Sequence, residues 1–155
     1  MDGRMSYDRP QVWRAGAIPY VVDPDTGEIE MLFMVPAGTD YNKDVPELTM
    51  PQIAKGRIER FENPLPAAIR ECIEELGLVE GNIETIIEGG VVLGRTHIYA
   101  FKVADKANFV GFSSETAETQ WLTHDQFMDS GRDLHKPVVD SLHNQIVEKY
   151  FTELA

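Results

Sequence analysis

The chain of 155 residues, 43% of them hydrophobic, suits one globular domain with a single core and leaves little room for a second. It contains no apolar run of the roughly 20 residues that cross a bilayer, and no apolar stretch follows residues 1–5 as in a secretory signal. Its formal net charge of −12 disfavours a nucleic-acid groove, which needs clustered Lys and Arg, but allows a phosphate substrate held through divalent cations.

The first predicted element is a β hairpin. Residues 12–22 and 29–35 are rich in aliphatic and aromatic side chains, and the turn-forming residues 23–27 separate them. Pro19 lies within the first strand and indicates an edge position or a bulge, because proline has no N–H for the sheet. A polar loop is then expected at residues 36–47.

A helix is predicted in the middle of the chain, at residues 64–76, after a short strand within residues 48–54 that leads to Gly56. Its apolar positions recur at helical spacing: Leu65, Ala68, Ile69, Cys72, Ile73 and Leu76. Three residues mark its ends: Asn63 as the cap, Pro64 at the first position and Gly77 as the terminator.

The second half of the chain mixes strands with two helices. The expected elements are strands at 83–93 and 96–104, a loop at 105–116, a short strand at 120–122, and helices at 123–128 and 136–152. Val139, Leu142, Ile146, Val147 and Tyr150 would form the buried face of the last helix. Strands on both sides of a central helix, with a helix at the end, predict an α/β sandwich with a mixed sheet.

The predicted central helix places three carboxylates on one face. Glu71, Glu74 and Glu75 are spaced i, i+3 and i+4, and they point away from the apolar stripe. Like charges at this spacing destabilise a helix slightly, and acids near its C-terminus oppose the helix dipole. A solvated acidic face paired with Arg70 is one explanation. The other is a hard cation such as magnesium, which prefers carboxylate and water oxygens.

The wider pattern favours the cation. Gly56 and Glu62, then Arg70-Glu71, Glu74-Glu75 and Gly77, stand at every fixed position of the Nudix box, with Cys72 and Leu78 in its aliphatic positions. A chance match in this chain is on the order of one in ten million. The chain therefore resembles the Nudix hydrolases over residues 56–78, and the order of its other elements resembles that family as well.

This resemblance implies a fold, a cofactor and roles. The fold would be a Nudix-type α/β/α sandwich with a mixed central sheet, a loop–helix–loop catalytic box and a C-terminal helix. The domain would span residues 12–155 after an extension at 1–11. The cofactor would be Mg²⁺ or Mn²⁺. The implied box roles are as follows: Glu71, Glu74 and Glu75 ligate metal, Arg70 orients them, Glu62 assists, Glu71 or Glu75 is the base, and Gly56 allows a sharp turn.

The resemblance also extends to substrate-binding residues. Lys55 resembles the phosphate-contacting lysine that precedes the box in many members, although Ala54 stands where proline is usual. Family members that cut diadenosine tetraphosphate have a similar tyrosine, here Tyr99, that stacks on adenine, and a similar opening at Arg14. In those members a glutamate before a tryptophan often completes the metal site.

Two residues fit this last position. Glu115 matches the family's glutamate best and Glu118 second, ahead of Trp121. The aromatic residues have a simpler explanation as members of the core. The histidines show no metal spacing among themselves and are expected at the surface or behind the first ligands.

The resemblance therefore predicts a hydrolase of dinucleoside polyphosphates. The alternatives are hydrolysis of ADP-ribose or another nucleotide sugar, removal of pyrophosphate from RNA 5′ ends, and a module that only binds nucleotides. The expected partner is a small nucleotide, with no membrane, with nucleic acid disfavoured apart from an RNA 5′ end, and with the oligomeric state open. The single cysteine, Cys72, cannot form an internal disulfide, so the expected location is cytoplasmic.

Overall fold

The computed structural model describes residues 12–38 and 45–154. The expected extension at residues 1–11 lies outside them, as does the middle of the polar loop expected at 36–47. The described elements follow in this order: β1 (Arg14–Val22), β2 (Ile29–Pro36), η1 (Pro46–Thr49), β3 (Ala54–Arg57), α3 (Pro64–Leu76), η2 (Glu80–Asn82), β4 (Ile83–Leu93), β5 (Thr96–Val103), β6 (Thr116–Leu122), α4 (His124–Ser130), η3 (Asp133–His135) and α5 (Lys136–Leu154).

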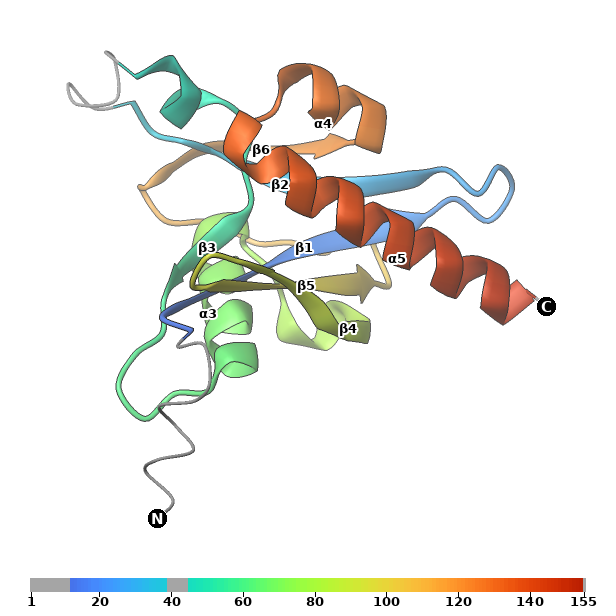
Figure 1. The fold of residues 1–155 in the computed structure, drawn as a ribbon, viewed down its shortest axis with the longest axis horizontal. Coiled ribbons are helices and arrows are strands. Elements are labelled where there is room, and N and C mark those ends of the chain that lie inside the picture. The colour runs from blue at the N-terminus through green and yellow to red at the C-terminus, as the bar shows by residue number, and fades with distance from the viewer. Residues whose placement is uncertain (1–11, 39–44, 155) are drawn as a thin grey trace.

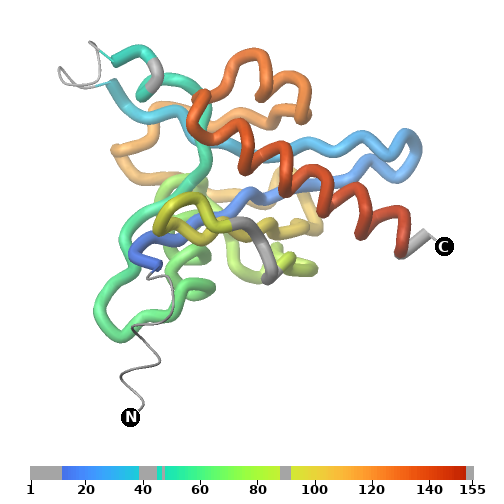
Figure 2. Tube along the Cα trace, in the orientation of Figure 1, coloured from blue at the N-terminus to red at the C-terminus, as the bar shows by residue number. Residues whose placement is uncertain are grey.

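The predicted hairpin is confirmed: β1 and β2 pair antiparallel. The Oδ1 atom of Asp23 accepts the N–H groups of Asp25 at 2.8 Å and Thr26 at 3.2 Å, which holds the turn. Gly27 ends the turn with a φ of 76°, in the left-handed region that glycine adopts without strain. The hairpin extends to one side of the molecule in the tube drawing (Figure 2).

The strands form one mixed sheet that forks beside β1. Its order is β4-β5-β1-β2-β6; β1 and β5 are parallel, and β3 pairs with β1 outside this order. The same edge of β1 pairs with β3 along Arg14–Ala17 and with β2 along Tyr20–Val22. Pro19 lies in the interval between these pairings, in a central strand, so its expected edge position was wrong. The strand changes partner there, which reduces the need for its missing N–H.

Helices cover both faces of the sheet, which confirms the predicted α/β sandwich (Figure 1). On one face α3 packs over a core that includes Ala17, Cys72 and Phe101. On the other face α4 and α5 pack over a second core that includes Phe33 and Leu142. We call these two faces of the sheet the α3 face and the α5 face.

Helix α3 has the predicted bounds, Pro64–Leu76. Gly77 ends it with a φ of 74°, and its N–H donates to the Ile73 carbonyl at 3.1 Å. Asn63 occupies the predicted N-cap position, but its side chain forms no capping hydrogen bond. Among the apolar positions of the helix, Ile73 is 39% exposed in the last turn, outside the stripe that faces the sheet.

Helix α4 begins after a capping box at Thr123 and ends at Ser130, beyond the predicted end at residue 128. The N–H of Gln126 donates to Thr123 Oγ1 at 3.2 Å, and the Thr123 N–H donates to Gln126 Oε1 at 2.9 Å.

Two strand predictions need correction. β6 begins at Thr116, four residues before the expected start, and residues 46–49 form the 3₁₀ helix η1 where a strand was expected from residue 48. Pro51 then precedes β3, and its missing N–H is consistent with that interruption.

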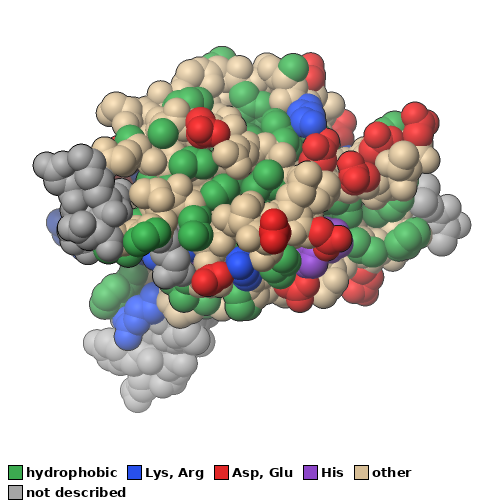
Figure 3. Space-filling view, turned by 90° about the horizontal axis from the view of Figure 1, so that it is seen from above, with side chains coloured by type: hydrophobic (Ala, Val, Ile, Leu, Met, Phe, Trp, Pro, Cys, Tyr) green, Lys and Arg blue, Asp and Glu red, His purple; other side chains and the backbone are tan. Residues whose placement is uncertain are grey.

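Acidic side chains are spread over the face seen in Figure 3, with histidine side chains among them. This distribution agrees with the net charge of −12. Within residues 12–38 and 45–154, no helix is long and apolar enough to cross a membrane.

Candidate active site

Gly56 in β3 lies in close contact with the Glu71 carboxylate of α3. It pairs with Ala15 of β1, and a Cβ atom built on it would overlap the Glu71 carboxylate. Its φ is not in the left-handed region, so the predicted reason for this glycine, a sharp turn, was wrong. The missing side chain makes room for a carboxylate that comes from α3.

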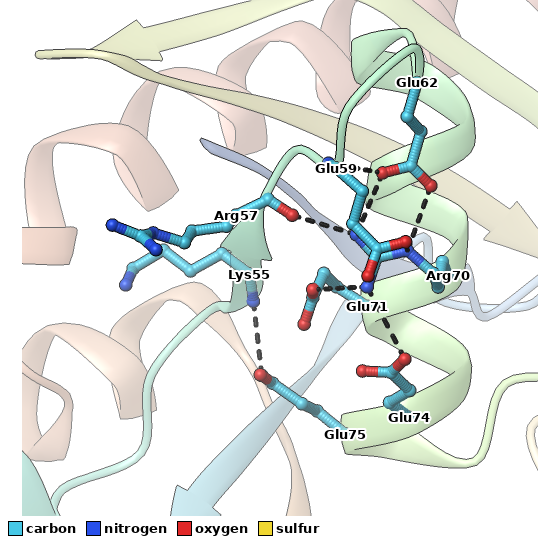
Figure 4. A network of polar contacts seen from close by, with 8 residues as sticks. All are labelled: Lys55, Arg57, Glu59, Glu62, Arg70, Glu71, Glu74 and Glu75. Carbon is cyan, nitrogen blue, oxygen red and sulfur yellow. Dashed lines mark hydrogen bonds and ion pairs between the residues drawn. The ribbon is translucent and has the colours of Figure 1, made fainter. Parts of the chain in front are cut away.

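Arg70 binds the acids of the box together (Figure 4). Its Nε and Nη2 atoms donate to the two oxygens of Glu62, each at 2.9 Å, in a bidentate pair. Its Nη1 donates to Glu71 at 2.8 Å and lies 3.5 Å from Glu74. Hydrogen bonding to Arg70 is the main cause that lowers the pKa of Glu62. Arg70 thus contacts three glutamates of the box, and its implied role in orienting metal ligands stays a prediction.

Two backbone contacts of this network could not be predicted from the sequence. The carbonyl of Arg57 accepts from Arg70 Nη2 at 2.8 Å, and the N–H of Glu59 donates to Glu62 at 2.9 Å. In the same loop Phe61 has a positive φ of 67° and is 94% exposed. Every residue has a backbone carbonyl and all but proline have a backbone N–H, so only the folded loop shows which residues form these contacts.

Glu71 and Glu75 are the acids that the fold withdraws from water. Burial is the main cause that raises the pKa of both, and it brings that of Glu75 to about 8. The charge of Glu71 is the second cause at Glu75. The Lys55 N–H donates to Glu75 Oε1 at 3.2 Å, and the Thr116 hydroxyl donates to the Glu75 carbonyl at 2.9 Å. These contacts fix Glu75 between β3 and β6.

The acids of the box are close together but do not converge. Among the residues that the structure describes, no three acidic, histidine or cysteine side chains meet as they stand at a point that would hold a metal ion. Arg70 holds Glu62 and Glu71 by hydrogen bonds, which keeps them from meeting the other acids. Repulsion between the carboxylates also keeps them apart. The backbone of α3 nevertheless places Glu71, Glu74 and Glu75 close together, beside Gly56 of β3.

The side chain of Lys55 lies on the other side of the sheet from these acids. Ala54 packs in the core under α3 and Gly56 contacts Glu71, so strand alternation directs Lys55 to the α5 face. Figure 4 shows the Lys55 and Arg57 side chains extending away from Glu74 and Glu75. Only the backbone N–H of Lys55 contacts an acid of the box.

Arg14 also lies on the α5 face. It is exposed at the start of β1, and its Cα atom pairs with Arg57 of β3 and with Thr96 of β5. The structure therefore places both predicted phosphate contacts, Lys55 and Arg14, across the sheet from the acids of the box.

Tyr99 is buried in the core on the α3 face and is 6% exposed. Its ring is parallel to that of His97, with 4.2 Å between the centroids, so one face of Tyr99 is covered. The Nε2 atom of His97 is buried and forms no hydrogen bond within the described chain. Adenine stacking on Tyr99 therefore stays a prediction, and His97 is a neighbour that sequence reasoning did not single out.

Glu115 and Glu118 differ in their surroundings. Both are exposed, but Glu115 lies in a segment that contacts the end of α3, where the Ser113 N–H donates to the Glu74 carbonyl at 2.7 Å and the Thr116 hydroxyl donates to the Glu75 carbonyl at 2.9 Å. Glu118 lies on β6, where its carboxylate accepts from the Gln120 amide at 2.8 Å. This geometry favours Glu115 over Glu118 as the additional acid.

Replacement of Arg70 by lysine tests the network. Lysine keeps the charge but lacks the planar fork, so we expect Arg70→Lys to lower the free energy of unfolding by roughly 1–3 kcal/mol at neutral pH. Because the folded pKa of Glu62 is depressed, this difference should shrink as the pH falls below the ordinary glutamate range. Urea unfolding at about pH 7 and about pH 4 measures both effects.

Arg60→Lys is the matched control, since Arg60 is exposed in the same loop and its guanidinium lies over the Phe61 ring, 5.0 Å from the centroid. Equal stability of the two lysine variants would contradict the role assigned to Arg70.

Among known protein families, the family model of the NUDIX domain matches residues 13–142. No curated protein matches the chain in sequence. Solved structures do match in fold, and three of them are described next.

A Nudix hydrolase from M. smegmatis, RenU, has a TM-score of 0.67 and 18% identity, over 88% of this chain and 87% of that one. The Ap4A hydrolase of C. elegans has a TM-score of 0.60 and 19% identity, over 91% and 97%. The NUDIX domain of Shewanella oneidensis NrtR, complexed with ADP ribose, has a TM-score of 0.54 and 11% identity, over 100% and 99%. At these identities the likeness concerns the fold.

Proposed function

The chain belongs to the NUDIX domain family, and we propose that it hydrolyses dinucleoside polyphosphates such as diadenosine tetraphosphate with the help of a divalent cation. As a Nudix hydrolase it acts on phosphoric anhydrides. The proposal adds the substrate, the ion and the roles of individual residues. The observation that carries it is the withdrawal of Glu71 and Glu75 from water beside Glu74 and Arg70.

A divalent cation fits the donor set of the box. The ligands proposed are the oxygens of Glu71, Glu74, Glu75 and Glu115, which suit Mg²⁺ or Mn²⁺. Burial raises the pKa of Glu75 to about 8, so its carboxylate is destabilised and a cation would relieve that cost. When bound, such an ion neutralises phosphate oxygens and helps ionise water.

The chain's own residues would position the reaction. Arg70 and Glu62 hold the ligand side chains in place, and Gly56 lets the Glu71 carboxylate reach β3. Glu71 or Glu75 would take the proton of the attacking water.

Substrate contacts are proposed for two regions. Lys55 and Arg14 would bind phosphates from the α5 face, and Tyr99 would contact the base. The buried and unpaired Cys72 supports a reducing compartment, and we place the activity in the cytoplasm.

The choice of substrate rests on two comparisons of different kinds. The segments around Arg14, Tyr99 and Glu115 resemble diadenosine tetraphosphate hydrolases in sequence. The C. elegans Ap4A hydrolase also shares the fold. Hydrolysis of ADP-ribose is the second candidate, because the fold also matches a NUDIX domain that was solved with ADP ribose.

A substrate panel tests the proposal. The protein with magnesium would be assayed against dinucleoside polyphosphates, ADP-ribose, nucleoside triphosphates and triphosphorylated RNA. We expect the highest kcat/KM for a dinucleoside tetraphosphate, and oxygen-18 water would identify the phosphorus attacked. If no dinucleoside polyphosphate is hydrolysed, the proposed substrate is wrong. Binding of nucleotide without any turnover would instead indicate a module that only binds.

A further inference from the structure

Three cations gather on the α5 face, across the sheet from the box. Arg14, Lys55 and Arg132 form this basic cluster. Arg14 and Lys55 come from neighbouring positions on β1 and β3, and Gly16 lies opposite Lys55 in the register. A Cβ atom on Gly16 would overlap Lys55, so the missing side chain gives the lysine its place. Arg132 comes from the segment between α4 and η3.

The basic cluster is only partly neutralised, because the charges of Glu75 and Glu71 act on Lys55. Across residues 12–38 and 45–154, none of its members forms an ion pair with a carboxylate. Arg132 is instead held by neutral groups: its Nη1 donates to Gln52 at 3.3 Å and its backbone N–H donates to the Pro51 carbonyl at 2.9 Å. Burial, followed by the charges of Arg14 and Arg132, lowers the pKa of Lys55. Like charges held together in this way favour the binding of an anion.

A buried donor without a partner lies beside the cluster. His135 is 1% exposed, and its Nδ1 accepts the Ile53 N–H at 3.1 Å, so its Nε2 carries the hydrogen. Nε2 has no partner in the described chain, which is unusual for a buried polar atom. Burial and the charges of Lys55 and Arg132 lower the pKa of His135 to about 3, so the ring stays neutral and Nε2 stays a donor.

The fork of the sheet connects this cluster to the box. The Lys55 N–H does not bond to β1 but donates to Glu75, so Glu75 lies on the open side of β3. The backbone of Lys55 therefore contacts an acid of the box, and the side chain of the same residue belongs to the basic cluster. The backbone and the side chain of Lys55 thus link the two regions.

We propose that the basic cluster, with the Nε2–H of His135, binds the phosphates of the substrate that lie beyond the cleaved linkage. Such a subsite selects chains of three or more phosphates over diphosphates such as ADP-ribose. The inference rests on the proposed function for its link to catalysis. Arg132 and His135 are the positions it adds to the substrate site.

Binding of inorganic tripolyphosphate to the full chain in EDTA tests the subsite without catalysis. We expect Arg132→Gln to weaken this binding about 10-fold, because a charge-assisted contact is lost, and to weaken pyrophosphate binding less. Arg60→Gln is the control for the loss of one exposed charge. With magnesium, Arg132→Gln should lower kcat/KM for a dinucleoside tetraphosphate at least about 5-fold more than for ADP-ribose.

A second measurement does not depend on a variant. The imidazole nitrogen spectrum of the wild-type protein should show the Nε2–H of His135 shifting when tripolyphosphate is added. Equal binding by Arg132→Gln and Arg60→Gln, or an unmoved His135 signal, would overturn the proposal. If no dinucleoside polyphosphate is hydrolysed while tripolyphosphate binding still depends on Arg132, the proposed substrate fails and the anion subsite stands.

Discussion

Replacement of Glu75 by glutamine should lower kcat by about three orders of magnitude while the fold is retained. Glutamine has the same shape, and its amide oxygen can still accept the Lys55 N–H that now donates to Glu75 at 3.2 Å. What it lacks is the negative charge that would bind the cation or take the proton from water. Steady-state hydrolysis of the best substrate from the panel, with magnesium, measures the loss.

The same variant should be more stable than the wild type at high pH without metal. The pKa of Glu75 is raised from 4.5 to about 8 by burial and by the charge of Glu71. Between these values the folded chain keeps a proton that the unfolded chain has lost, so wild-type stability falls as the pH rises. The glutamine variant does not titrate, and its advantage should grow from near zero at about pH 4.5 to roughly 1–4 kcal/mol above pH 8.

Urea unfolding in EDTA at about pH 5 and about pH 9 measures this advantage. Glu148→Gln, which removes one exposed charge on α5, is the control. Added magnesium should stabilise the wild type and not the Glu75 variant. A Glu75→Gln protein that turns over at the wild-type rate, or that is no more stable at pH 9 than at pH 5 relative to the control, would contradict the role of this carboxylate.

Local signals were enough to predict the helix that carries the acids. Pro64 begins α3 because its fixed φ suits the first turn, and Gly77 ends it because the left-handed conformation is accessible there. Apolar residues at helical spacing placed Cys72 and Leu76 against the sheet, where both are buried. Once the helix was assigned, its period alone put the carboxylates on one face.

The positions that depend on strand pairing could not be predicted. The strand expected within residues 48–54 begins at Ala54, and this boundary decides which way Lys55 points. Alternation from Ala54 then directs Lys55 to the α5 face, and the sequence analysis could not assign a face to this residue.

Long-range contacts were equally invisible in the sequence. His135 and Ile53 are 82 residues apart and meet through one hydrogen bond of 3.1 Å. Arg132 and Gln52 are 80 residues apart and meet in the same region. Neither pair has a spacing or a motif that marks it, because the contacts arise when η3 packs beside the segment that leads to β3. A cluster of cations in an acidic chain therefore becomes visible only in the fold.

Replacement of Gly56 by alanine should reduce activity at least about 100-fold, because the added methyl group displaces a proposed metal ligand. In most exposed strand positions the same change is nearly neutral or slightly stabilising. Here a Cβ would overlap the Glu71 carboxylate, and Glu71 is 8% exposed and hydrogen-bonded to Arg70 at 2.8 Å, so it cannot move freely. We expect a loss of roughly 1–3 kcal/mol in the free energy of unfolding.

A double-mutant cycle separates this overlap from a general effect of alanine. Shortening the opposing side chain with Glu71→Ala removes the obstacle, so Gly56→Ala should cost less stability in that background than in the wild type. Gly81→Ala is the control, because nothing lies within 4 Å of the Cβ it adds. Additive effects of the two alanines would mean that the Glu71 carboxylate does not press on Gly56. The requirement for glycine at position 56 would then come from the backbone and not from contact with Glu71. The position of Glu71 would then have a different cause.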